Sequence, residues 1–144
     1  MNVAFRVDAS RRIGIGHFMR CVCLADALYR RGATIRFVTR QLPTHLREML
    51  IDRSYDVAAV DGIADAQETA GALAATAWDW LIVDHYALDA RWEAMLRGHT
   101  KQILAIDDLA DRPHDCDVLL DQNLHADMDR RYAGKVPPTC QLLL

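Results

Sequence analysis

The sequence predicts an α/β domain with a doubly wound parallel sheet of the Rossmann type. Short continuous apolar runs alternate along the chain with segments of helical periodicity. Strands that are apolar throughout, and not only at every second residue, are typical of parallel sheets covered on both faces. Right-handed crossovers between such strands then produce the doubly wound fold. The length of 144 residues fits one domain of roughly 100–150 residues.

The first half of the chain contains three strand patterns and three helix patterns. The first apolar run ends at Asp8, and after a glycine-containing loop the period becomes helical from His17. Gly32 predicts the end of that helix because glycine accepts a left-handed conformation after the last turn. Pro43 favours the start of a second helix. The expected elements are strands 3–7, 34–39 and 56–60 and helices 17–28, 43–50 and 65–77.

The second half continues the alternation with shorter elements. Three apolar runs, 80–83, 102–106 and 118–120, are each followed by an aspartate. Between the first two, Trp92, Met95 and Leu96 predict a helix closed by Gly98. The segment 136–144 is typical of an apolar strand cut short, so we expect the chain to stop at a border between domains.

Composition excludes several classes of function. The net charge is −3 with both signs mixed, so no basic surface for nucleic acid is expected, and the doublets 11–12 and 30–31 are interpreted as solvated charges. The N-terminus lacks the pattern of a signal peptide, and no run approaches the ~18 apolar residues of a membrane span. We therefore expect a cytoplasmic protein with reduced cysteines.

The four cysteines do not predict a metal site. Cys21 and Cys23 are two apart on an expected helix, so their side chains diverge by about 200°. Cys116 and Cys140 are far from them in sequence and form no CxxC pair. We interpret all four as small apolar side chains that fill space.

Polar residues follow four of the expected strands directly. In an open α/β sheet the ligand crevice lies beyond the carboxyl ends of the strands. Any one aspartate there could simply cap a helix or hold a turn, but the set on one edge predicts a site. The polar groups are Asp8, Asp84-His85-Tyr86, Asp107-Asp108 and Asp121-Gln122-Asn123.

The loop Gly14-Ile15-Gly16-His17 is the most informative segment. Its glycines allow close approach to a ligand, and the helix that follows offers free N–H groups suited to phosphate. A dinucleotide fingerprint is not complete, because Met19 stands where its third glycine would fall, and no Walker lysine follows. A P-loop nucleotide hydrolase is therefore not expected.

His17 is the candidate general base. The positive end of the helix disfavours a charged imidazole, and a neutral imidazole can take a proton from water. The residues alone leave open a histidine that only forms hydrogen bonds in the loop. No role is assigned to the histidines in polar or loop contexts, which are His45, His99, His114 and His125.

Several motifs, taken together, resemble one enzyme family over essentially the whole chain. The chain is similar to the UDP-2,4-diacetamido-2,4,6-trideoxy-β-L-altropyranose hydrolases of bacterial pseudaminic acid biosynthesis. That family is similar in turn to two-domain glycosyltransferases of the GT-B class. The motifs are Arg6-Val7-Asp8-Ala9-Ser10, Gly14-Ile15-Gly16-His17-Phe18-Met19-Arg20-Cys21, Trp80-Leu81-Ile82-Val83-Asp84-His85-Tyr86, Ile106-Asp107-Asp108-Leu109-Ala110-Asp111-Arg112, His114-Asp115-Cys116-Asp117 and Leu120-Asp121-Gln122-Asn123.

The resemblance implies a reaction and a set of site residues. Water attacks the anomeric carbon of the sugar, UDP leaves with inversion, and the free sugar continues towards pseudaminic acid, a sugar of flagellins and surface polysaccharides. The resemblance places the general base on His17 and implies no metal or other cofactor, since backbone N–H groups can stabilise the departing diphosphate. The candidate substrate-binding residues are Asp8, Gly14, Ile15, Gly16, Asp84, His85, Tyr86, Asp107 and Asn123.

Two departures from the family qualify that expectation. Ile15 stands where the family commonly has threonine, so a possible hydroxyl contact is lost. The family also continues past Leu144 into a second, nucleotide-binding domain that this chain lacks. We therefore expect the chain alone to be weak or inactive, with the second domain as its partner.

Two other functions remain as alternatives. A related glycosyltransferase would use His17 to activate a sugar hydroxyl in place of water, and would release UDP only with an acceptor. A non-catalytic domain that binds a sugar or a partner protein would keep its function when His17 is replaced.

Overall fold

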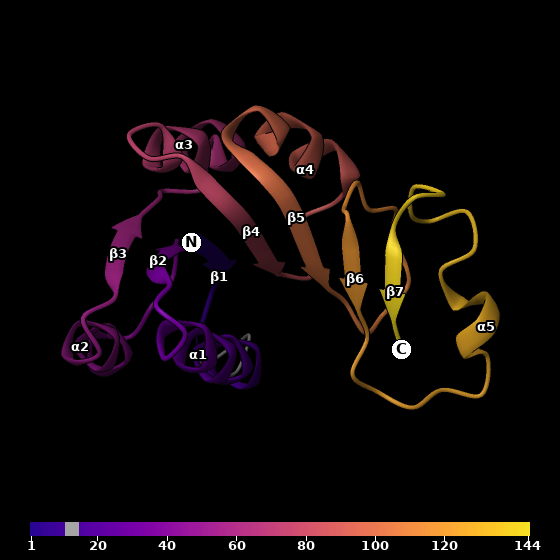
Figure 1. Ribbon diagram of the computed structural model, residues 1–144, viewed down its shortest axis with the longest axis horizontal. Helices are drawn as coiled ribbons and strands as arrows, with labels where there is room; N and C mark the ends of the chain where they lie inside the picture. Colours follow the sequence, from indigo (N-terminus) through magenta and orange to yellow (C-terminus); the bar gives the residue numbers. More distant parts are fainter. Residues whose placement is uncertain (11–14) are drawn as a thin grey trace.

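The computed structural model describes residues 1–10 and 15–144 and confirms the predicted fold class. In this part of the chain, seven strands form one parallel sheet in the order β3-β2-β1-β4-β5-β6-β7 (Figure 1). The strands are β1 (Asn2–Val7), β2 (Thr34–Thr39), β3 (Asp56–Ala59), β4 (Trp78–Asp84), β5 (Thr100–Ile106), β6 (Val118–Leu120) and β7 (Gln141–Leu143). The helices are α1 (Gly16–Tyr29), α2 (Thr44–Asp52), α3 (Asp65–Leu73), α4 (Ala90–Leu96) and α5 (Met128–Arg131), with a 3₁₀ turn at Arg97–His99.

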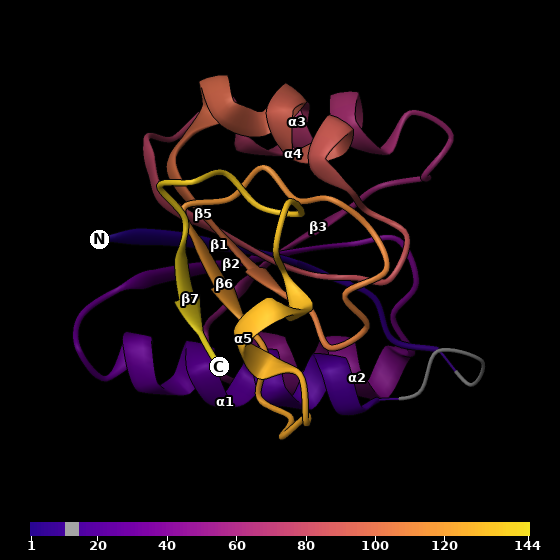
Figure 2. The same ribbon diagram turned by 90° about the vertical axis from the view of Figure 1, so that its right-hand side faces the viewer.

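Helices cover both faces of the sheet. Helices α1 and α2 lie on one side and α3 and α4 on the other, as the two perpendicular views show (Figures 1 and 2). The side chains of β1 alternate between the two layers: Val3, Phe5 and Val7 join the core under α1, and Ala4 joins the core under α3 and α4. The rings of Phe5 and Phe37 stack with centroids 4.9 Å apart. Because the central strands are covered on both faces, they are largely apolar, as predicted, with the buried Arg6 of β1 as a charged exception.

The strand order reverses at β1. This strand pairs with β2 on one side and with β4 on the other, and Val7 at its end lies beside Asp84 at the end of β4. The chain leaves β1 towards α1 on one face and leaves β4 towards α4 on the other. The two loops therefore diverge and leave a crevice at the carboxyl ends of β1 and β4.

Several element ends differ from the predicted ones. Helix α3 ends at Leu73 and not at residue 77, because the chain must turn before β4, and the indole N–H of Trp78 donates to the Leu73 carbonyl at 3.0 Å. Helix α4 ends at Leu96, and a 3₁₀ turn containing Gly98 follows, so this glycine is not the left-handed stop that was expected. Strands β4 and β5 each begin two residues earlier than predicted.

The C-terminal segment completes the sheet. The apolar end of the chain forms β7 at Gln141–Leu143, which pairs in parallel with β6 as the edge strand. Helix α5 was not predicted, since its four residues carry no apolar period. No helix among the described residues has the length and apolar character needed to cross a membrane.

Gly32 ends α1 in the left-handed conformation that the sequence predicts. Its φ is +84°, and its N–H donates to the Tyr29 carbonyl at 2.9 Å. We expect Gly32→Ala to lower the free energy of unfolding by about 1 kcal/mol, because a Cβ is disfavoured at this backbone conformation. Gly71→Ala is the control, since Gly71 lies within α3 with open space at its Cβ, and it should raise stability by about 0.5–1 kcal/mol. Urea unfolding of both variants measures the difference, and equal shifts would contradict the prediction.

Candidate functional site

A cavity of about 220 Å³ lies at the crevice between the ends of β1 and β4. It is formed where the loop after β1, the start of α1 and the loop after β4 meet. The lining residues are Asp8, His17, Asp84, His85, Tyr86 and Ala87. The structure therefore brings together five of the residues that the sequence predicted for a site.

His17 is the second residue of α1, and its side chain is 11% exposed. Its Nδ1 atom lies 2.6 Å from Oδ1 of Asp84. The ring packs edge-on against Tyr86, with centroids 4.5 Å apart and planes at 85°. The histidine is thus held on two sides, by a carboxylate and by an aromatic ring.

Asp84 is the buried last residue of β4. Its carboxylate accepts hydrogen bonds from Nε of Arg20 at 2.5 Å and from Nη2 of Arg20 at 2.7 Å, besides its contact with His17. Burial alone raises the pKa of Asp84, but the hydrogen bonds from Arg20 and His17 and the charge of Arg20 outweigh it and lower the pKa below its usual range. Asp84 is therefore ionised, and its hydrogen bonds hold the carboxylate in one orientation.

The contacts of Nδ1 select one tautomer of His17. Nη2 of Arg20 also lies 2.8 Å from this nitrogen, so the nitrogen could accept from Arg20 or donate to Asp84, but not both. If Nδ1 carried no hydrogen, its lone pair would face a lone pair of Asp84 Oδ1 at 2.6 Å, which is repulsive. Arg20 does not need Nδ1 as an acceptor, because its Nη2 already donates to the same carboxylate. We therefore assign the hydrogen to Nδ1, which donates to Asp84 and leaves the lone pair on Nε2.

His85 follows Asp84 in the chain, and it differs from His17 because both of its ring nitrogens have partners. Its Nε2 lies 3.2 Å from Oδ2 of Asp8, and its Nδ1 accepts from the backbone N–H of Ala87 at 3.1 Å. No side chain or backbone group of residues 1–10 and 15–144 forms a hydrogen bond with Nε2 of His17. His17 is thus the histidine of this crevice with a nitrogen available for chemistry.

Asp8 is a buried anchor at the base of the crevice. It is paired with Arg6, whose Nη1 donates at 2.8 Å, and it accepts from the backbone N–H of Arg40 at 2.7 Å and from the hydroxyl of Thr39 at 3.2 Å. Burial raises the pKa of Asp8, but its hydrogen bonds to His85 and Arg6 prevail and hold the pKa well below its usual range. Its oxygens therefore organise the loops around the crevice.

The glycine-containing loop is described in part. Gly14 lies outside the described residues. Ile15 is exposed and precedes α1 without a side-chain cap, and Gly16 begins the helix with no atom of the described residues within 4 Å of where its Cβ would be. With no acidic side chain in its first turn, the start of this helix suits an anionic group.

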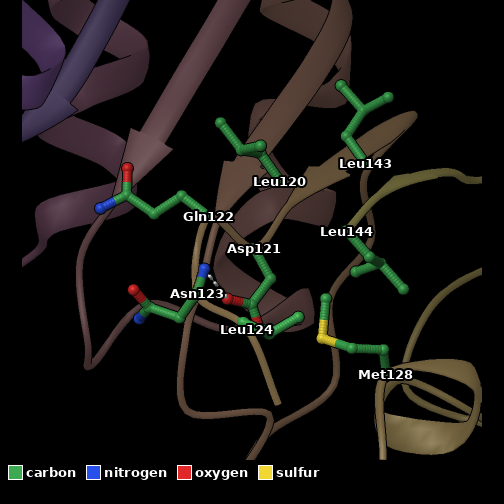
Figure 3. A pocket seen from close by; sticks show the side chains of 8 residues that line it. All are labelled: Leu120, Asp121, Gln122, Asn123, Leu124, Met128, Leu143 and Leu144. Carbon is green, nitrogen blue, oxygen red and sulfur yellow. Dashed lines mark hydrogen bonds between the residues drawn. The ribbon is translucent and has the colours of Figure 1, made fainter. Parts of the chain in front are cut away.

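Asp107 and Asn123 lie apart from this cavity. The Asp107 carboxylate is buried and accepts from the N–H of Ala110 at 2.8 Å and from the Tyr132 hydroxyl at 3.2 Å. Asn123 lines a separate, open cavity of about 420 Å³ at the ends of β6 and β7, among leucines and Met128 (Figure 3). The structure therefore does not bring these two residues to His17.

Of two further residues near the crevice, Arg20 was not predicted as a site residue, and Asp108 was predicted only as part of the polar set at the strand ends. Arg20 lies three positions after His17 on α1, so both project from the same face, and that spacing was a usable signal. Asp108 follows Asp107, and its Oδ2 lies 3.7 Å from Nη1 of Arg20. Nothing in the sequence distinguished it from Asp107, because only the path of the loop decides which carboxylate faces the crevice.

The search for metal-binding groups covered residues 1–10 and 15–144. No cluster of three His, Cys, Asp or Glu side chains suited to a metal ion lies among them. Cys116 and Cys140, distant in sequence, have their sulfurs 3.6 Å apart and lie in the core under α3 and α4. Their packing there agrees with small side chains that fill space.

Comparison with known proteins finds a similar enzyme but no matching family model. No family model matches the chain. The chain is 29% identical over 143 residues to the UDP-2,4-diacetamido-2,4,6-trideoxy-β-L-altropyranose hydrolase of Campylobacter jejuni. The match covers 99% of this chain and 48% of the relative, so the chain spans about half the length of the relative. The resemblance predicted from the motifs is thereby confirmed over the N-terminal half of that enzyme.

Proposed function

We propose that the chain is the N-terminal, catalytic domain of an inverting UDP-sugar hydrolase. The observation that carries the proposal is the His17–Asp84 pair, which leaves Nε2 of His17 available at the crevice where the strand order reverses. The similarity to the altropyranose hydrolase supports a UDP-linked 2,4-diacetamido-2,4,6-trideoxy sugar as the substrate. The reaction would then belong to pseudaminic acid biosynthesis.

In the proposed reaction His17 is the general base. Nε2 takes a proton from water while the water oxygen bonds to the anomeric carbon, and the C1–O bond breaks on the opposite face. The electron pair of that bond leaves with UDP, and the product is the free sugar of inverted configuration. Asp84 stabilises the imidazolium that forms, as a buried carboxylate does in related histidine–carboxylate pairs.

The start of α1 would serve the departing diphosphate. Its backbone N–H groups carry partial positive charge, and Gly16, which has no side chain, favours close approach of a ligand to them. Ile15 adds no hydroxyl here, so backbone groups would carry this contact. We further propose a GT-B-like arrangement in which a second, C-terminal domain binds the uridine. The relative, about twice as long as this chain, supports that arrangement.

Proton NMR of the full-length protein with the UDP-diacetamido sugar tests the proposal. We expect UDP release without an acceptor, and a first-formed free sugar of the opposite anomeric configuration. UDP release only after addition of an acceptor would replace the hydrolase by a glycosyltransferase. Binding of the sugar nucleotide with no release under either condition would leave only a binding domain.

A further inference from the structure

One oxygen of Asp84 is shared by two donors. Its Oδ1 lies 2.6 Å from Nδ1 of His17 and 2.7 Å from Nη2 of Arg20. Because both donors meet at the same oxygen, they also lie only 2.8 Å from each other. With the hydrogen of His17 on Nδ1, this contact is not a hydrogen bond but the close approach of a permanent cation to the imidazole ring. A positive charge on that ring would lie directly against the guanidinium.

Arg20 is held in this position by its pairing with Asp84. Its Nε donates to Oδ2 at 2.5 Å, so that together with Nη2 it binds both oxygens of the carboxylate. The hydrogen bonds to Asp84 raise the pKa of Arg20 above its ordinary value, against the effect of burial, and the guanidinium therefore stays charged. The side chain of Arg20 is 17% exposed and that of Asp84 is 1% exposed. Solvent therefore screens these charges only weakly.

Two other titratable side chains near His17 are uncharged at neutral pH. Tyr86 packs against the imidazole ring, and burial first and the charge of Asp108 second raise the pKa of its hydroxyl. The sulfur of Cys21 lies 3.6 Å from Oδ2 of Asp84, and burial raises the pKa of this thiol well above its ordinary value. Neither group changes the charge around the imidazole in the range where histidine titrates.

Two further carboxylates lie near the crevice. Asp8 lines the same cavity as His17, but it is paired with a buried arginine of β1 and lies 3.2 Å from Nε2 of His85. Asp108 lies 3.7 Å from Nη1 of Arg20. Among residues 1–10 and 15–144, neither Asp108 nor the carboxylate that holds His17 forms an ion pair with another arginine or with a lysine. Removing Arg20 would therefore leave uncompensated negative charge on this side of the ring.

We infer that Arg20 is a positioning residue that keeps His17 in the neutral form able to take a proton from water. Asp84 alone would favour the imidazolium, because an opposite charge 2.6 Å away stabilises it. Arg20 offsets this effect by its own charge, while its two hydrogen bonds fix the carboxylate that orients Nδ1. The catalytic part of this inference rests on the proposed function, whereas the charge balance is a property of the protein without substrate.

NMR of the full-length protein without substrate follows the protonation of His17 directly, with His17→Ala to identify its signals. Arg20→Met removes the charge, and we expect the midpoint of the imidazole titration to rise by about one pH unit or more. Asp84→Asn should lower the midpoint, because the guanidinium then has no counter-charge. The double variant should return towards the wild-type midpoint. Arg20→Lys keeps the charge and should leave the midpoint within about half a pH unit of the wild type.

The pH dependence of UDP release separates this role from a merely structural one. In Arg20→Met, kcat/KM should fall by about tenfold or more near neutral pH and recover as the pH rises, because the imidazole then loses its proton. In Arg20→Lys the acid limb of the profile should stay in place, although kcat falls because an ammonium cannot bind both oxygens in the same geometry. Arg47→Met, at an exposed position of α2, is the control and should change neither measurement.

The two measurements distinguish failure of this inference from failure of the proposed function. A midpoint that does not rise in Arg20→Met, or a loss of kcat/KM that is equal at every pH, would overturn the inference and leave the hydrolase in place. If the wild type releases no UDP but the single variants shift the midpoint in opposite directions, the hydrolase proposal fails. Control of the charge on His17 by Arg20 would then still stand.

Discussion

Replacing His17 by alanine is expected to reduce the rate of UDP release by about 10²–10⁴-fold, the usual contribution of a positioned general base. The loss should fall on kcat, because the imidazole acts on water and not on the sugar nucleotide. Release of UDP followed by NMR or by a coupled assay measures it. His45→Ala is the matched control, since that histidine is exposed on α2 and should leave the rate unchanged.

Asp84→Asn extends the same prediction to the partner of His17. The amide keeps the shape of the side chain but removes the charge that fixes Nδ1–H and stabilises the imidazolium. Because the two residues act as a unit, the double variant should lose little more than His17→Ala alone. A His17→Ala enzyme with wild-type activity would refute the assignment of the base.

Replacing Arg6 by methionine is expected to lower the free energy of unfolding by about 3–5 kcal/mol, the cost of breaking a buried ion pair from one side. Arg6 is 1% exposed, and it donates to Asp8 at 2.8 Å and to Asp65 at 2.5 Å. Its removal leaves two carboxylates without their cation. Arg91→Met is the control, because Arg91 pairs with Asp89 at the exposed surface, and its loss should change the free energy of unfolding far less than Arg6→Met does.

The effect of Arg6→Met should depend on pH in a defined direction. In the wild type the pKa of Asp8 is lowered, so its contribution to stability is present above the usual aspartate range and is lost as the pH falls below it. The variant lacks much of this contribution at every pH. The difference in unfolding free energy should therefore be largest near neutral pH and should narrow on acidification in denaturant titrations. A difference that grows as the pH falls would contradict this account.

The fold could be predicted because its signals are local. The central strands are covered on both faces and are therefore largely apolar, and the aspartates at the carboxyl ends of β1 and β4 marked the edge where the cavity lies. Properties that depend on distant partners were not accessible. The end of α3 depends on the indole of Trp78, and the different surroundings of Asp107 and Asp108 depend on Tyr132 and Arg20. His114 lies in a loop, as expected, but its burial and its contact with Glu93, 2.8 Å from Nδ1, could not be predicted.

The pairing of β1 with β4 also bears on how the protein is made. His17 and Asp84 are 67 positions apart in the chain, and they meet only when these two strands lie side by side. A nascent chain that has left the ribosome as far as β3 already contains His17 and α1, but not the carboxylate that orients the histidine. The contact between His17 and Asp84 therefore forms only when the fourth strand joins the sheet beside β1.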